Sequence, residues 1–108
     1  MSTPAKNATL SSLAEVDRLI HEPARLAVIA LLYVVESADF IFLINQTGLT
    51  WGNLSAHMSK LEEAGYIEVV KSFKGKQPNT MLRLTQAGRA AFQAYRQKMK
   101  RVMDGLPE

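Results

Sequence analysis

The chain has 108 residues, of which 47% are apolar and 21% are charged, with a net charge of +3 and no cysteine. These values suit one domain with a single hydrophobic core, and the lack of cysteine excludes disulfides, thiolate metal sites and cysteine nucleophiles. No apolar run approaches the roughly 20 residues of a membrane-spanning helix, and the N-terminus lacks the apolar segment of a signal peptide, so we expect a cytoplasmic protein without a membrane partner.

The N-terminal third predicts an arm and two helices. Residues 1–11 are mostly small and polar, as in a flexible N-terminal arm, and residues 12–108 are expected to form one domain. Apolar residues then recur at helical spacing and predict a first helix from about Ser12 to His21. Pro23 suits the first turn of a second helix that continues to about Glu36. That second helix is apolar nearly all round, so we expect it to be buried.

Two shorter helices are expected next. Ser37 and Asp39 can cap a helix from Ala38 to about Gln46, which Gly48 would end. Thr50 stands where an N-cap belongs, ahead of a helix over residues 51–64. Within that helix an apolar stripe marks the inward face, and a glycine follows as a C-terminal stop (Leu54, Met58, Leu61; Gly65).

The outer face of the helix over residues 51–64 is small and polar. Its members carry short side chains, hydrogen-bonding groups or a single positive charge (Gly52, Asn53, Ser55, Ala56, Ser59 and Lys60). A helix that enters the major groove of DNA needs such a surface, because it must be thin and must carry donors and acceptors for the edges of the bases.

Past Gly65 the pattern changes from helical to alternating, which predicts a two-stranded hairpin. Ile67 and Val69 share one face of the first strand, and Leu82 and Leu84 share one face of the second. The residues between them, 71–80, contain three lysines and are expected to form a long connection, because they exceed a tight turn. Residues 71–103 carry nine basic side chains and no acidic one, whereas residues 1–70 carry four basic and eight acidic ones. This segregation indicates a surface for a polyanion.

Thr85 can cap a last helix over residues 86–103. An apolar stripe on this helix is longer than a small domain is expected to cover, so we interpret it as a dimerisation surface that the first helix joins. The predicted dimer interface consists of Leu13, Val16, Ile20, Phe92, Tyr95, Met99 and Val102.

The order of these elements is that of a winged helix-turn-helix domain, mainly α with a small β-hairpin. The segments RLIHEPARLAVIALL, DFIFLINQTGLTWGNLSAHMSKLEEAGYIEV and KSFKGKQPNTMLRLTQAGRAAFQAY resemble short bacterial and archaeal winged-helix transcriptional regulators, near the multiple-antibiotic-resistance regulator (MarR) and arsenical-repressor (ArsR) groups. The resemblance covers roughly residues 18–95. It implies a sequence-specific regulator of transcription that binds double-stranded DNA as a homodimer. The cysteine ligands of metal-sensing repressors are absent, so the resemblance does not extend to metal sensing.

The resemblance assigns DNA-binding roles to ten residues. The helix over residues 50–64 would enter the major groove, and the basic wing over residues 71–80 would lie on the flanking backbone or in the minor groove. The expected DNA contacts are Thr50, Trp51, Asn53, Ser55, Ala56, Ser59 and Lys60 on the helix, and Lys74, Gly75 and Lys76 on the wing.

Several alternatives stay open at this point. Trp51 and His57 suit the core as well as they suit DNA, and Phe73 suits local packing at the base of the wing better than insertion between bases. The fold leaves room for an unidentified small-molecule effector near Tyr33, Phe40 and Phe42. No catalytic, metal or cofactor residues are expected, because the sequence has no credible triad, phosphate loop or metal-ligand spacing. The alternative function is a winged-helix protein-interaction module that does not bind DNA.

Overall fold

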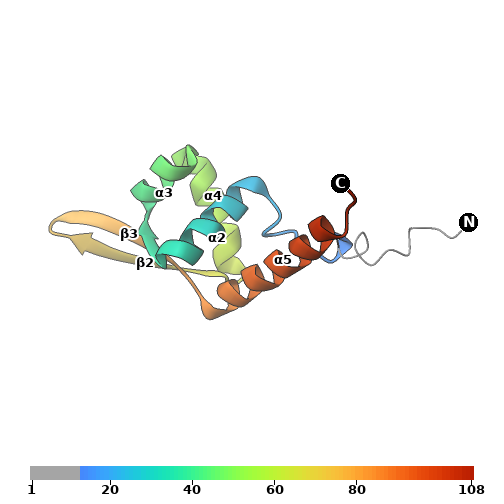
Figure 1. Ribbon diagram of the computed structural model, residues 1–108. Coiled ribbons are helices and arrows are strands. Elements are labelled where there is room, and N and C mark those ends of the chain that lie inside the picture. Colours follow the sequence, from blue (N-terminus) through green and yellow to red (C-terminus); the bar gives the residue numbers. More distant parts are fainter. Residues whose placement is uncertain (1–12) are drawn as a thin grey trace, which may run out of the picture.

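A computed structural model describes residues 13–108. Helices α2, α3 and α4 pack together into one body (Figure 1). The β2–β3 hairpin projects from one side of this body, and the C-terminal end of α5 projects from the other side. The predicted fold, mainly α with a β-hairpin, is therefore present, while the expected arm over residues 1–11 lies outside the described residues. The elements are α2 (Pro23–Val35), β1 (Ser37–Asp39), α3 (Phe40–Thr47), α4 (Trp51–Glu63), β2 (Ile67–Lys74), β3 (Gln77–Leu84) and α5 (Gln86–Asp104).

Side-chain caps fix the starts of these helices. Glu22 caps α2 by accepting from the backbone N–H of Arg25 at 2.8 Å, and Pro23 follows in the first turn. This N–H lowers the pKa of the Glu22 carboxyl below its usual range. Asp39 caps α3 in the same way, through the N–H of Phe42 at 2.7 Å. Gly48 then ends α3 with a φ of 72°, as predicted.

The first predicted helix is wrong from residue 15 onward. Residues 13 and 14 are helical, but residues 15–22 form turns, bends and, at residue 17, irregular structure. The Asp17 side chain explains the change, because it accepts from the backbone N–H groups of Leu19 and Ile20, at 2.9 and 3.3 Å. Such local bonds compete with helical hydrogen bonding. The segment still buries Val16 and Ile20 in the core, so the apolar spacing was a packing signal without a helix.

The sheet has three strands, where the sequence predicted two. Ser37–Asp39 form β1, which pairs with β3 in the order β1-β3-β2, so the predicted start of a helix at Ala38 is wrong. Ala38 lies opposite Leu82 and is buried with it. A three-residue strand is too short to show an alternating pattern, and its pairing with a distant strand is not visible in the sequence.

The connection between β2 and β3 is also shorter than predicted. Both strands continue through residues 71–80, with Lys74 opposite Gln77, and only Gly75 and Lys76 form the turn. Gly75 has a φ of 66°, whereas Lys76 has no positive φ, which is the type II′ pattern with glycine at the first central position. The prediction failed because polar, glycine- and proline-containing strands resemble loops when no core face marks their alternation.

Contacts of the Tyr66 region hold the base of the hairpin against α5. The backbone carbonyl of Tyr66 accepts from the N–H of Thr85 at 3.0 Å, and a Cβ on Gly88 would come within 2.1 Å of the same oxygen. Glycine is therefore required for this close approach. The Tyr66 hydroxyl donates to Asp17 at 2.5 Å, and this bond raises the pKa of Tyr66 to about 12.

Candidate nucleic-acid interface

Helix α4 separates a buried apolar side from an exposed polar side. The predicted inward residues Leu54, Met58 and Leu61 are all buried. Thr50 caps the helix, and its side-chain oxygen accepts from the N–H of Asn53 at 3.1 Å. These contacts confirm the predicted N-terminus and inward stripe, and they place α4 on the body with one side free.

The free side of α4 carries the residues that the sequence assigned to DNA. All seven of them are exposed: Thr50, Trp51, Asn53, Ser55, Ala56, Ser59 and Lys60. At helical spacing, Gly52, Ala56 and Ser59 form the line opposite the buried stripe. This outermost line is thin, because none of its side chains is larger than a hydroxymethyl group. Glu62 and Glu63 add negative charge at the C-terminal end, so the part of α4 suited to an anion is its N-terminal part.

Trp51 lies at the surface and stacks on Phe40. The two ring centroids are 4.6 Å apart and the rings are inclined by 19°, while 59% of Trp51 remains exposed. Trp51 is therefore not a core residue. The stack fixes the orientation of the indole at the N-terminal end of α4 and leaves most of its surface free for a ligand.

His57 faces the body. Its Nδ1 accepts a hydrogen bond of 3.0 Å from Nη1 of Arg25, because arginine has only donors. Glu22 lies 3.8 Å from the same nitrogen. The ring is half-buried between α4 and the start of α2. This arrangement resolves the alternative for His57 in favour of a structural residue that joins two helices.

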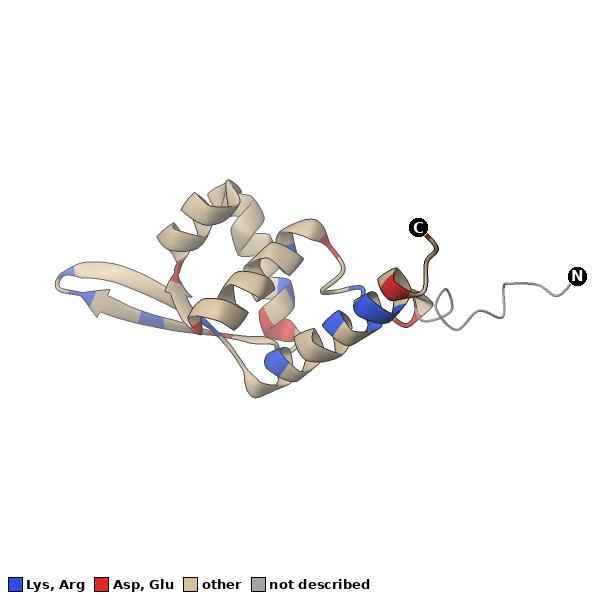
Figure 2. Ribbon diagram, viewed as in Figure 1, with Lys and Arg blue, Asp and Glu red and all other residues tan. Residues whose placement is uncertain are grey.

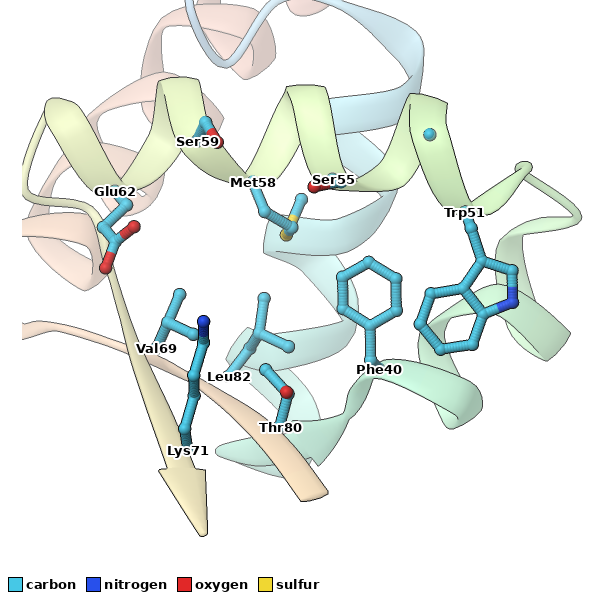
Figure 3. A pocket seen from close by; sticks show the side chains of 11 residues that line it. Phe40, Trp51, Ser55, Met58, Ser59, Glu62, Val69, Lys71, Thr80 and Leu82 are labelled. Carbon is cyan, nitrogen blue, oxygen red and sulfur yellow. The ribbon is translucent and has the colours of Figure 1, made fainter. Parts of the chain in front are cut away.

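A hollow of about 520 Å³ lies between α4 and the hairpin. In Figure 3, Phe40 and Trp51 stand side by side at one end, and Glu62 and Lys71 stand at the other. Its lining is mixed, with apolar floor residues and hydroxyl groups at the rim (Met58, Val69 and Leu82; Ser55, Ser59 and Thr80). The hollow connects the exposed face of α4 to the hairpin, so both can contact one elongated ligand.

Phe40, Lys71 and Thr80 also line this site, although the sequence did not single them out as individual DNA contacts. Lys71 lies opposite Thr80 in the strand register, on the same face as Val69 and Leu82. The alternation of β2 was the available signal, because Lys71 continues the inward set of Ile67 and Val69 by one step. That signal was lost when the strand was expected to end before Lys71.

The hairpin carries a positive charge that no acidic neighbour on it neutralises. Glu68 is the one acidic residue of residues 67–84, and it pairs with Arg83, which stands opposite it. Lys71, Lys74 and Lys76 remain, and they are exposed. The basic segments follow the hairpin to its tip, and a second basic stretch follows α5 (Figure 2). The tip, with Gly75 in its turn, is therefore a compact cationic surface.

Tyr33 and Phe40 line two different hollows. Tyr33 faces α5, where Gln93 donates to its hydroxyl at 3.2 Å and the guanidinium of Arg89 lies 4.8 Å from the ring centre. Phe40 belongs to the hollow beside α4. Tyr33 and Phe40 therefore do not share one hollow, and an effector site near these aromatic residues stays a prediction.

Most residues of the predicted dimer stripe are buried within the chain itself. Val16, Ile20, Phe92, Tyr95 and Val102 are each 7% exposed or less, Met99 is half-buried and Leu13 is exposed. His21, for example, covers Tyr95 through a hydrogen bond of 2.7 Å between Nδ1 and the hydroxyl. Five members of the stripe therefore need no second copy to cover them. The dimer contact itself stays a prediction.

Comparison with protein families gives one match that covers most of the chain. Residues 24–103 match the family described as winged helix DNA-binding domain. An uncharacterized protein of Methanocaldococcus jannaschii is 37% identical over 78 residues, which are 72% of this chain and 85% of that protein.

Comparison with solved structures gives the same fold. A transcriptional regulator homologue of Pyrococcus horikoshii superimposes with a TM-score of 0.85 at 27% identity, over 91% of this chain and 99% of that one. NadR, solved in complex with 4-hydroxyphenylacetate, superimposes with a TM-score of 0.67 at 20% identity, over 96% and 82% of the two chains. Within residues 13–108, no helix is long and apolar enough to cross a membrane.

Proposed function

Because this chain belongs to the winged helix DNA-binding domain family and is a DNA-binding regulator of transcription, we propose that α4 enters the major groove while the β2–β3 hairpin contacts the flanking backbone or minor groove. The observation that carries the proposal is the joint exposure of a thin polar helix face and a cationic hairpin on two sides of one hollow. Asn53, Ser55, Ala56 and Ser59 contact base edges, because they are exposed and either carry donors and acceptors or are small enough for close approach.

The contacts to phosphate come from the edges of the same surface. Lys60 on α4 and Lys74 and Lys76 on the hairpin are exposed cations, and Lys71 lines the hollow between the two elements. Thr50 and Trp51 stand at the N-terminus of α4, where free N–H groups favour an anion. A sugar-phosphate strand that follows the hollow meets Trp51 and Lys71, which line it, and Lys74 and Lys76 extend the contact along the hairpin. Affinity thus comes from these groups at the edges and sequence preference from α4.

A homodimer completes the proposal. Four base-facing positions on one helix are few for a specific site, and two copies read twice as many base pairs. The support comes from the projecting end of α5 and the segment beside it, where Leu13, Met103 and Leu106 are exposed. Lys98 on α5 donates to the carbonyl of Glu15 at 3.1 Å, so the two segments lie together. Burial of such apolar side chains between two copies is favourable.

The protein-interaction alternative requires an apolar patch on the outer face of α4. Apart from Trp51, no large apolar side chain is exposed on that helix. The alternative therefore lacks its expected surface, and DNA remains the ligand that the chemistry of this face favours.

Selection from a pool of random duplexes at moderate salt tests the proposal. We expect an enriched palindrome whose half-sites are about one helical turn apart. The affinity for it should fall steeply with salt, by about 0.9 in the log–log slope for each neutralised phosphate. Enrichment of a single half-site would refute the dimer and keep the DNA contact. A pool that stays unselected, with binding insensitive to salt, would refute the whole proposal.

A further inference from the structure

The inner face of the β2–β3 hairpin changes character along its length. In register, this face carries the pairs Ile67–Leu84, Val69–Leu82, Lys71–Thr80 and Phe73–Pro78, because alternate residues share a face. Ile67, Leu82 and Leu84 belong to the core, and Lys71 and Thr80 line the hollow beside α4. Beyond them the face becomes apolar again at Phe73 and Pro78.

Phe73 is exposed at a position where the fold gives it little to pack against. It is 74% exposed and stands one residue from the turn, so the expected packing at the base of the wing is wrong. Pro78, directly opposite, is exposed too. A cross-strand pair of this kind stabilises a hairpin only weakly. Burial of Phe73 against a ligand would contribute more, because it removes a whole phenyl side chain from water.

Pro78 fits its position in the ladder without loss. Lys74 and Gln77 flank the two-residue turn and exchange hydrogen bonds, so the next pair, Phe73 and Pro78, is the non-hydrogen-bonded kind. The backbone nitrogen of Pro78 therefore points away from β2, and β1 pairs only with residues 81–83. The missing N–H costs nothing there. The tip thus keeps a regular ladder while it presents two rigid apolar rings on one face.

The charges around this pair select its ligand. Lys71 shares the face of Phe73, Lys74 lies next to Phe73 on the opposite face, and Lys76 stands in the turn. Residues 69–103 hold no acidic side chain. An apolar group on a hairpin tip with these lysines suits a polyanion that has an apolar interior. Duplex DNA is such a ligand, because phosphates line its surface and stacked bases fill its centre. Phe73 also lies on the hairpin face that lines the hollow beside α4, the side that the proposed function gives to DNA.

We propose that Phe73, supported by Pro78, is an apolar wedge that enters the minor groove beside the half-site, partly unstacks one base step and bends the duplex. This inference rests on the proposed function of α4 and the hairpin. Apolar side chains act in this way in minor-groove binders, where the cost of unstacking is offset by the wider contact that a bent duplex allows. The narrow turn at Gly75 and Lys76 lets the tip approach the groove, and the adjacent lysines hold the two phosphate rows. Flexible pyrimidine–purine steps at the flank are then preferred, although no donor reads them.

The test uses the full chain and the duplex obtained by selection, with a donor and an acceptor fluorophore at its two ends. Energy transfer reports the bend, anisotropy reports affinity, and 2-aminopurine placed in turn at each flanking step reports unstacking. We compare the wild type with Phe73→Ala, Phe73→Leu and Val70→Ala. Val70 is the matched control, because it is an exposed apolar residue of β2 on the opposite face. Thermal melting of each variant checks that the hairpin and the fold are kept.

The wedge predicts a distinct set of results. The wild type should raise energy transfer and 2-aminopurine fluorescence at one flanking step. Phe73→Ala should abolish both and weaken binding on the order of tenfold, Phe73→Leu should keep most of the bend, and Val70→Ala should match the wild type. Tight binding to a straight duplex, or a bend that survives Phe73→Ala, would overturn the wedge and leave the proposed function intact. Loss of the bend in Val70→Ala as well would assign the effect to hairpin stability and would also overturn it. A wild type that binds no duplex would instead refute the proposed function.

Discussion

Helix α4 and the β2–β3 hairpin are both exposed, but they owe their positions to different forces. The helix is held by three buried side chains along its whole length, so every exposed residue on it has a fixed orientation. The hairpin is held only at its base, where Ile67, Leu82 and Leu84 enter the core. Its outer half is ordered by backbone pairing alone, which constrains shape less than a core does. A fixed element suits recognition of base edges, and a projecting one suits contact with a backbone of variable shape.

The largest effect is expected at the hairpin. Lys74→Ala plus Lys76→Ala should weaken binding to every duplex by about 3 kcal/mol, because two charge-assisted contacts are lost. The salt slope should fall by about 2. Titration at several salt concentrations, with selected and scrambled duplexes, measures both quantities. Lys100→Ala plus Arg101→Ala on α5 removes the same charge and should change little; an equal loss there would mean that net charge, and not the hairpin, provides the affinity.

A change at the base of the hairpin should destabilise the whole domain. In Gly88→Ala the new Cβ would meet the Tyr66 carbonyl, so α5 or β2 must shift. We expect a loss of about 3 kcal/mol in the free energy of unfolding, the upper end for overpacking. Urea denaturation measures it. The control is Gly52→Ala on α4, where a Cβ meets nothing within 4 Å and where alanine favours the helix by about 1 kcal/mol. A stable Gly88→Ala protein would show that the close contact between α5 and the Tyr66 carbonyl is not needed.

Asn53→Ala on α4 should change the sequence preference, whereas the lysine variant should change the affinity for every duplex. We expect a loss of about 2 kcal/mol for the preferred duplex, confined to one base pair, with an unchanged salt slope. Affinities for the selected duplex and for its single-base-pair variants give the result. Asn45→Ala, an exposed asparagine on α3, serves as the control. If Asn53→Ala weakened binding to all duplexes equally, Asn53 would be a backbone contact.

The smallest effect is expected at Tyr66, whose hydroxyl ties the segment at Asp17 to the hairpin base. Its pKa is raised from 10.0 to about 12 by the bond to Asp17, so the folded state favours the protonated phenol. This contribution to stability is complete below pH 10 and is lost as the pH rises from 10 through 12. Tyr66→Phe should cost about 1 kcal/mol at neutral pH and should flatten the fall in stability above pH 10.

Chemical denaturation at a series of alkaline pH values compares Tyr66→Phe with the wild type. Tyr33→Phe is the control, because the Gln93 hydrogen bond lowers the pKa of Tyr33. Removal of the Tyr33 hydroxyl should therefore leave the alkaline fall in stability in place. An alkaline fall that persists unchanged in Tyr66→Phe would contradict this assignment.

Local sequence patterns were sufficient to predict the helices with a buried face and clear ends. Thr50, Thr85, Gly48 and Gly65 mark the ends of helices through local bonds and local backbone geometry, and all four have the roles expected of them. The exposed face of α4 followed from the same local periodicity. Such features depend on neighbours within about four residues, which is why a sequence alone reveals them.

Other features depend on pairing and packing that form only when the chain folds. Residues 37–39 become a strand because Leu82 and its neighbours supply hydrogen bonds, and the stripe on α5 is buried because Val16, Ile20 and His21 fold back onto the core. The hairpin extends to Gly75 because β2 and β3 pair beyond the core, where no apolar alternation marks them. That extension places Phe73 near an exposed tip. Phe73 was expected to pack within the protein, but the pairing of β2 with β3 beyond the core leaves it exposed as a candidate contact with DNA.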